Sequence, residues 1–161
     1  MIVAGCPAAP GEEHRDGRQL LAQLYLQQTG MPLPPILKTA MGKPYFSESL
    51  WHFSITHTRG QVFCALAQQP LGIDAERLDR RINPALAEKI LSPSEWEQYQ
   101  SAADKQRALL TFWVLKEAEA KASGKGLRIY PNHTAFRLDD PRVTERDGCL
   151  LAVVVGSEIL L

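Results

Sequence analysis

The segment Phe112-Trp-Val-Leu-Lys-Glu-Ala-Glu-Ala-Lys-Ala-Ser-Gly-Lys-Gly-Leu127 has the composition of a long helix that ends at a glycine. Gly124 is placed to close this helix in the left-handed conformation. Glu117 and Lys121 are four residues apart, so their side chains share one helix face. A solvated ion pair is the ordinary interpretation of this spacing. An acid between Lys116 and Lys121 also suits the binding of a metal-bridged phosphate.

A second acidic pair lies upstream, in the sequence Gly-Ile-Asp-Ala-Glu that ends at Glu76. Asp74 and Glu76 are two residues apart on a predicted strand, so both carboxylates leave the same face. They repel each other unless a cation lies between them. The pair is either a strand end that runs into solvent or a Mg²⁺ site with Glu117 as third ligand. In the second case Lys116 and Lys121 would neutralise substrate phosphates.

The composition is that of an ordinary globular chain. Of 161 residues, 45% are hydrophobic and 22% are charged, and 18 basic residues balance 18 acidic ones. A neutral chain lacks the broad positive field of a non-specific nucleic-acid binder. No apolar run reaches the length of about 18 residues that a membrane helix needs, and the first residues lack the basic region of a signal peptide. We expect a cytoplasmic protein with Cys6, Cys64 and Cys149 as free thiols.

Periodicity predicts four helical segments. Apolar residues on one face and a stop at Gly30 define a helix over residues 12–28. The sequence Ser92-Pro-Ser-Glu is a start signal for a helix over residues 94–102. The remaining helical segments are residues 84–91 and 104–123.

Strand patterns surround these helices. Trp51, Phe53 and Ile55 alternate with polar residues, which is typical of a half-buried strand. Strands joined by short connections are expected to pair antiparallel, as hairpins. The order of elements predicts an α+β fold with antiparallel sheet rather than a doubly wound parallel sheet. The other predicted strands are residues 1–4, 61–67, 71–76, 134–138 and 150–155.

Two further motifs contain residues that suit ligand binding. His57 lies among hydroxyl side chains with Arg59 nearby, and it is either a surface residue or a phosphate ligand. Gly42-Lys43-Pro44 marks a turn whose lysine is either merely exposed or in contact with a ligand. The chain has no G-x-S-x-G elbow for a serine nucleophile. It also has no glycine-rich phosphate loop before a helix.

Four motifs resemble those of the 4'-phosphopantetheinyl transferases of the surfactin-synthetase-activating type. They are Gly-Lys-Pro from Gly42, Ser-Ile-Thr-His-Thr from Ser54, Gly-Ile-Asp-Ala-Glu from Gly72 and the segment from Phe112. The resemblance covers residues 42–127. It implies two similar α+β halves, each an antiparallel sheet with a helix, packed around a pseudo-twofold axis. Residues 1–69 would form a shortened first half and residues 70–161 the second, together one domain with coenzyme A between them.

The resemblance also implies metal and phosphate ligands. Asp74, Glu76 and Glu117 would hold Mg²⁺ against the pyrophosphate of coenzyme A. Lys116 and Lys121 would contact phosphate oxygens.

The remaining candidates would bind the nucleotide end of coenzyme A. On the family's pattern His57 would contact the 3'-phosphate, and Lys43 with Thr56 would line the adenine region. Arg15 is the candidate for a basic residue that the shortened first half otherwise lacks.

The implied activity is Mg²⁺-dependent transfer of 4'-phosphopantetheine from coenzyme A to a serine of an acyl or peptidyl carrier protein. Glu117 would deprotonate that serine, so the chain needs no nucleophile of its own. The alternative is a shortened family member, expected like the enzyme to be a monomer, that binds carrier protein or coenzyme A without transfer. Carrier proteins are acidic, and Arg77, Arg80 and Arg81 are either a solvated turn or their docking surface.

Overall fold

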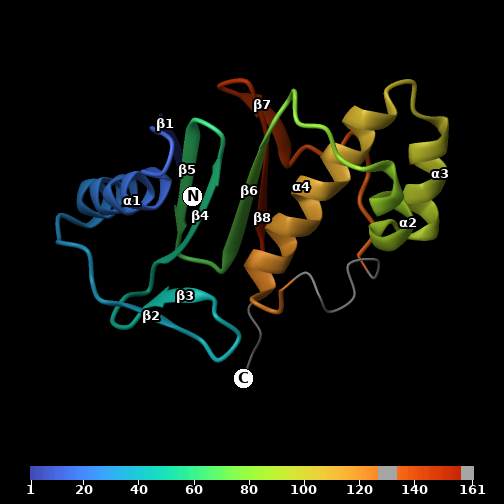
Figure 1. The fold of residues 1–161 in the computed structure, drawn as a ribbon. Coiled ribbons are helices and arrows are strands. Elements are labelled where there is room, and N and C mark those ends of the chain that lie inside the picture. Colours follow the sequence, from blue (N-terminus) through green and yellow to red (C-terminus); the bar gives the residue numbers. More distant parts are fainter. Residues whose placement is uncertain (127–133, 157–161) are drawn as a thin grey trace.

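The chain folds into two antiparallel sheets that pack against each other, each with a long helix over its outer face (Figure 1). The computed structural model describes residues 1–126 and 134–156. Every strand pair in those two ranges is antiparallel. The predicted α+β class is therefore confirmed.

The first sheet has the strand order β1-β5-β4 and carries helix α1. Leu21 and Leu24 of α1 pack with Phe53 and Leu66 of the sheet in one apolar cluster. A short hairpin of β2 and β3 lies beside this sheet. The elements are β1 (Ile2–Pro7), α1 (Glu13–Thr29), β2 (Ile36–Lys38), β3 (Pro44–Phe46), β4 (His52–Thr58) and β5 (Gln61–Ala67).

The second sheet has the order β6-β8-β7 and carries helix α4. Phe112 and Leu115 of α4 pack with Leu150 of β8 and with the short helices at the far end of the molecule. The elements are β6 (Leu71–Arg77), the 3₁₀ turn η1 (Pro84–Leu86), α2 (Ala87–Ile90), α3 (Pro93–Ser101), α4 (Lys105–Ser123), β7 (Val143–Arg146) and β8 (Cys149–Val155).

Local capping sets the ends of the helices near the predicted positions. Ser92 and Glu95 form a reciprocal capping box at the start of α3. The side chain of Asp104 accepts a hydrogen bond from the backbone N–H of Arg107 at the start of α4. Gly124 closes α4 at φ 70°, a conformation in which a side chain would be strained.

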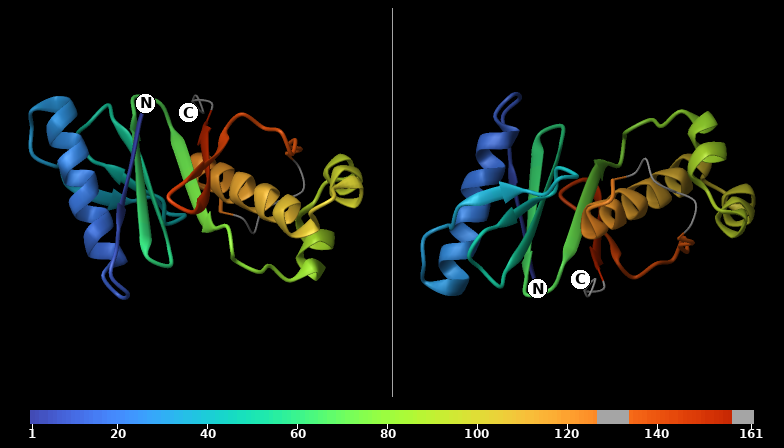
Figure 2. Two further views of the ribbon diagram at one scale, coloured as in Figure 1. Left: turned by 90° about the horizontal axis from the view of Figure 1, so that it is seen from above. Right: turned by 90° about the horizontal axis from the view of Figure 1, so that it is seen from below.

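Both sheets repeat one topology. In each, a strand is followed by a long helix and then by a hairpin whose second strand lies in the middle of the sheet. Seen from above and below, the layers run from α1 through the two sheets to α4 (Figure 2). The faces that meet are apolar and contain Phe63, Ile73 and Leu151, all buried.

Strands β4 and β6 lie side by side where the two sheets meet. The hydroxyl of Ser54 on β4 accepts a hydrogen bond of 3.2 Å from the backbone N–H of Ile73 on β6. Among the described residues no backbone ladder joins the two strands, so this side chain takes the place of a strand partner.

Three sequence predictions are wrong in detail. Strand β6 follows β5 closely but pairs with β8, because the chain crosses into the second sheet at Pro70. Residues 134–138 form no strand, and the hairpin partner of β8 is Val143–Arg146. Strand β4 is not half-buried: Ser54 and Thr56 are as buried as Phe53, because the second sheet covers their face.

Two expectations from composition can be compared with the structure. Within the described ranges, no helix combines the length and apolar character needed to cross a membrane. Cys6, Cys64 and Cys149 all lie in those ranges, and each is a free thiol.

Candidate functional site

Asp74 is a buried carboxylate on β6, with 6% of its surface exposed. Its Oδ1 accepts hydrogen bonds from Lys121 Nζ at 2.7 Å and from the Thr56 hydroxyl at 3.1 Å. Its Oδ2 is buried and has no partner among the described residues. Burial raises the pKa of the Asp74 carboxyl, although Lys121, Thr56 and Arg80 act in the opposite direction.

Lys121 lies where β4 and β6 meet. From the last turn of α4 its ammonium group donates to Asp74, to the backbone carbonyl of Ile73 at 3.1 Å and to the Thr56 hydroxyl at 3.3 Å. Helix α4 lies this close to β6 because position 72 is glycine. A Cβ built on Gly72 would stand 1.9 Å from the carbonyl oxygen of Ala118.

Glu117 lies one helical turn before Lys121, on the same face of α4. Burial raises the pKa of the Glu117 carboxyl, and the negative charge of Asp74 raises it further. Lys121 and Arg80 oppose this effect. Within the described ranges no hydrogen bond or ion pair engages the Glu117 carboxylate, so two acids that repel each other share this part of the site.

The carboxylate of Glu76 has different hydrogen-bond and ion-pair partners from that of Asp74. Its carboxylate forms an ion pair with Arg80 and accepts weak hydrogen bonds of 3.4 Å from the indole N–H of Trp113 and from the Thr58 hydroxyl. The guanidinium carbon of Arg80 stands 5.9 Å from the centre of the Trp113 ring, close enough for a cation–π contact.

One cavity of about 360 Å³ brings these groups together. The three predicted metal ligands line it with one lysine, one hydroxyl and one imidazole. Its lining is Ile55, Thr56, His57, Asp74, Glu76, Trp113, Glu117 and Lys121. In the described ranges no three His, Cys, Asp or Glu side chains are arranged to hold a metal ion. The carboxylates therefore share a cavity without forming a closed ligand set.

His57 lies at the edge of this cavity and is exposed. The ring of His14 from α1 packs edge-on against it, with ring centres 4.9 Å apart. Arg15, the predicted basic residue, lines neither this cavity nor the next one described. It points to solvent and pairs with Glu12 and Asp16. The sequence prediction thus chose the neighbour of the residue that contacts His57.

Lys43 lies in the turn between β2 and β3, beside the C-terminal end of α4. Its ammonium group donates to the backbone carbonyl of Ala122, and burial lowers its pKa. A second cavity of about 280 Å³ includes Gly42, Lys43 and Pro44 together with Glu117 and Lys121. The Gly-Lys-Pro turn and the acidic site therefore line adjoining cavities. Thr56 lines only the acidic one.

Lys116 is not part of this group. Its side chain is 1% exposed and its Nζ lies 2.8 Å from Oε2 of Glu95, which is itself fully buried. Glu95 also accepts hydrogen bonds from the backbone N–H groups of Ser92 and Phe136. The expected contact of Lys116 with a phosphate does not agree with this position, because consecutive helix residues point in directions about 100° apart.

Sequence reasoning missed Trp113, Thr58 and His14 as site residues. Trp113 precedes Glu117 by four residues, so helix periodicity places it on the same face. Thr58 is two residues after Thr56, on the same face of β4. No local signal marks His14, because its contact with His57 depends on how α1 packs on the first sheet.

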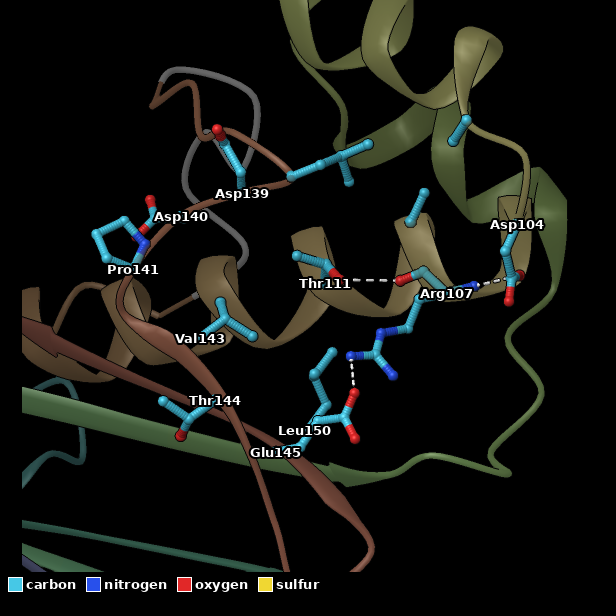
Figure 3. A pocket seen from close by; sticks show the side chains of 13 residues that line it. Asp104, Arg107, Thr111, Asp139, Asp140, Pro141, Val143, Thr144, Glu145 and Leu150 are labelled. Carbon is cyan, nitrogen blue, oxygen red and sulfur yellow. Dashed lines mark hydrogen bonds and ion pairs between the residues drawn. The ribbon is translucent and has the colours of Figure 1, made fainter.

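A third cavity, larger than the two described above, lies at the other end of α4 (Figure 3). It measures about 480 Å³, and an ion pair of Arg107 with Glu145 crosses it. None of the residues predicted from the sequence lines it. We therefore take the acidic cavity, and not the largest one, as the candidate site.

Comparison with known proteins agrees with the motifs. The profile of the 4'-phosphopantetheinyl transferase superfamily matches residues 70–151. The 4'-phosphopantetheinyl transferase gsp of Aneurinibacillus migulanus is 34% identical over 117 residues, 70% of this chain and 48% of that protein. HetI of Nostoc, a 4'-phosphopantetheinyl transferase, is 34% identical over 137 residues, 72% of this chain and 58% of that protein.

A shorter relative matches as well. The holo-[acyl-carrier-protein] synthase of Yersinia pestis is 42% identical over 64 residues, 36% of this chain and 51% of that protein. The chain spans about half the length of the curated relatives it matches. With a family profile over half of its residues and an acidic site on the matched strand and helix, this chain belongs to the 4'-phosphopantetheinyl transferase superfamily.

Proposed function

We propose that this chain transfers 4'-phosphopantetheine from coenzyme A to a serine hydroxyl of an acyl or peptidyl carrier protein and releases 3',5'-ADP. The observation that carries the proposal is the cavity in which Asp74, Glu117 and Lys121 meet. Carboxylates that can bind a divalent cation, with a lysine beside them, suit a charged phosphoanhydride better than a neutral ligand. Membership of the superfamily supports the same chemistry.

The carboxylate oxygens of this site are suited in part to binding Mg²⁺. Asp74 Oδ2 is buried without a partner, and the Glu117 carboxylate beside it makes no ion pair in the described ranges. Both are hard oxygen ligands of the kind that Mg²⁺ takes. Glu76 would be the third ligand once it leaves Arg80. The ion would supply positive charge that stabilises the pyrophosphate as the phosphoanhydride bond breaks.

The chain's own residues have separate roles in this proposal. Lys121, already positioned by three acceptors, adds positive charge near the 5'-phosphate of 3',5'-ADP as it leaves. Glu117 accepts the proton of the carrier serine as general base, because its carboxylate lines the cavity and makes no hydrogen bond or ion pair within the described ranges. Lys116 is left out because its ammonium group is buried against Glu95.

The nucleotide end of coenzyme A is assigned to the adjoining groups. His57 at the rim would contact a phosphate, with His14 beside it. Lys43 and its turn would line the adenine region in the second cavity. Thr56 orients Asp74 and Lys121 through its hydroxyl.

The two halves are proposed to be residues 1–69 and 70–161, related by a pseudo-twofold axis within one domain. The repeated strand–helix–hairpin topology supports this division. It also accounts for a site formed by β4 of one half and β6 with α4 of the other.

The direct test is the intact mass of an apo carrier protein after incubation with coenzyme A, Mg²⁺ and this protein. We expect a mass gain of one phosphopantetheine group. Asp74→Asn should lower the transfer rate about 10²–10³-fold, the loss typical for one group that stabilises developing charge. Asp79→Asn is the matched control, because Asp79 is exposed and pairs with Arg59 outside the acidic cavity.

Two outcomes would contradict the proposal. Coenzyme A binding without any mass gain across several carrier proteins would favour the binding module instead. Equal transfer rates for Asp74→Asn and Asp79→Asn would show that the acidic cavity is not the reaction site.

A further inference from the structure

Arg80 is the cation closest to Glu76, and it reaches the acidic cavity from outside it. The side chain of Arg80 is 44% exposed, whereas that of Glu76 is 13% exposed. Arg80 itself lines a neighbouring cavity of about 380 Å³ together with Arg59, Arg77 and Arg81. Glu76 is the residue that the two cavities have in common. Its carboxylate can therefore face either side.

Several contacts hold Arg80 toward the acidic side. Its guanidinium group pairs with Glu76 and lies near the ring of Trp113. Its charge also attracts Asp74 and Glu117. The turn that carries it is closed by a hydrogen bond from its own N–H to the carbonyl of Arg77. Arg80 is thus a half-exposed cation that contacts one of the three carboxylates assigned to Mg²⁺ and acts through its charge on the other two.

We propose that Arg80 is a built-in counter-ion of Glu76 that a divalent cation must displace, so that Arg80 sets the metal affinity of the site. This inference rests on the proposed function for the metal itself. A carboxylate that is paired with a guanidinium group and hydrogen-bonded to Trp113 must lose that pair before it can serve as a metal ligand. Breaking the ion pair between Arg80 and Glu76 costs free energy, and this cost weakens the observed affinity for the ion.

Displacement has a second consequence for the neighbouring cavity. When Glu76 turns to the ion, Arg80 loses its partner and becomes an exposed positive group beside Arg77 and Arg81 in this cavity. Loading of the metal would then increase the positive charge offered to an acidic partner at this rim.

The test measures Mg²⁺ binding by calorimetry for the full chain and two charge-matched variants, Arg80→Gln and Arg81→Gln. Both remove one positive charge from the same turn, but only Arg80 pairs with Glu76. We expect Arg80→Gln to bind Mg²⁺ up to about fivefold more tightly than Arg81→Gln, which is the range for loss of a competing ion pair of about 0.2–1 kcal/mol. In a Glu76→Gln background most of this difference should disappear, and only the weaker effect of the Arg80 charge on Asp74 and Glu117 should remain.

The outcomes separate this inference from the proposed function. Equal Mg²⁺ affinities of Arg80→Gln and Arg81→Gln, or weaker binding by Arg80→Gln, would overturn the counter-ion role and leave the transferase proposal intact. Phosphopantetheine transfer with no measurable Mg²⁺ binding by any variant would overturn the metal ligands and this inference together. Circular dichroism spectra and melting temperatures establish that each variant is folded, and the neutral pair Arg80→Met and Arg81→Met replaces the glutamine variants if Arg80→Gln is not.

Discussion

Gly72→Ala should separate helix α4 from strand β6. The added Cβ would stand 1.9 Å from the carbonyl oxygen of Ala118, 2.4 Å from the backbone nitrogen of Ala122 and 2.9 Å from Cβ of Lys121. Two of these atoms are backbone, so no side-chain rotation removes the overlap. The shortest contact must lengthen to at least 3.0 Å, which moves the helix or the strand by about 1 Å.

The expected cost follows from that displacement. Overpacking of a well-packed core costs typically about 1–3 kcal/mol, and a clash of backbone with backbone belongs at the upper end. A loss of about 3 kcal/mol corresponds to a fall in melting temperature of about 6–12 °C for a chain of this size. Transfer should fall by about 10²-fold, because a shift of about 1 Å moves Lys121 and Glu117 relative to Asp74.

Thermal and urea unfolding measure the first effect, and the carrier mass assay measures the second. Gly156→Ala is the matched control, because its Cβ would meet Ala122 and Pro70 at an ordinary 3.6 Å. If Gly72→Ala unfolds within about 0.5 kcal/mol of the natural chain, as expected for a surface substitution, then α4 does not lie on β6 as described and the reasoning fails.

Two further substitutions test buried charges. Glu117→Gln should raise the free energy of unfolding at neutral pH by less than about 1 kcal/mol, since solvent screens this partly exposed carboxylate, because the folded state raises the pKa of Glu117 and so disfavours its ionised form. This gain should vanish as the pH falls toward the ordinary value of 4.5; urea unfolding at both ends of that range checks it, and a pH-independent gain would contradict it. Lys116→Met should cost about 3–5 kcal/mol, because the buried charge of Glu95 loses its cationic partner and keeps only two backbone N–H donors. The double variant with Glu95→Gln should recover most of that loss in the same assay, and no recovery would mean that packing rather than charge sets the cost.

Local sequence signals predicted those parts of the fold that depend on near neighbours. The capping box at Ser92 and the glycine after Ser123 lie within the elements that they end, so the helix bounds were correct to within a few residues. Strand pairing depends on distant partners, and the prediction of β6 beside β5 failed for that reason. The alternating pattern of β4 predicts that its polar face is exposed to solvent. The sequence does not reveal that a second sheet covers Ser54 and Thr56 on this face.

The candidate site shows the same division. Asp74 and Glu117 were found because strand and helix periodicity fix their faces, and the fold brings both into one cavity. Lys116 was grouped with them because it is adjacent to Glu117 in sequence, although its side chain points into the core. Arg80 could not be recognised as a partner of Glu76, since four residues along a strand end and turn have no fixed geometry.

The contact between β4 and β6 differs from the strand pairs within each sheet, because it uses the hydroxyl of Ser54 instead of a backbone ladder. Within each sheet, several backbone hydrogen bonds must break together before two strands separate and their amide hydrogens exchange with solvent. The amide of Ile73 is protected by one hydrogen bond to a side chain. The exchange rate of that single amide hydrogen therefore reports how often β4 and β6 part. A chain that keeps both sheets folded can still loosen the groove between them, and Ser54→Ala would speed deuterium uptake at Ile73 while uptake in the middle of β5 and β8 stays slow.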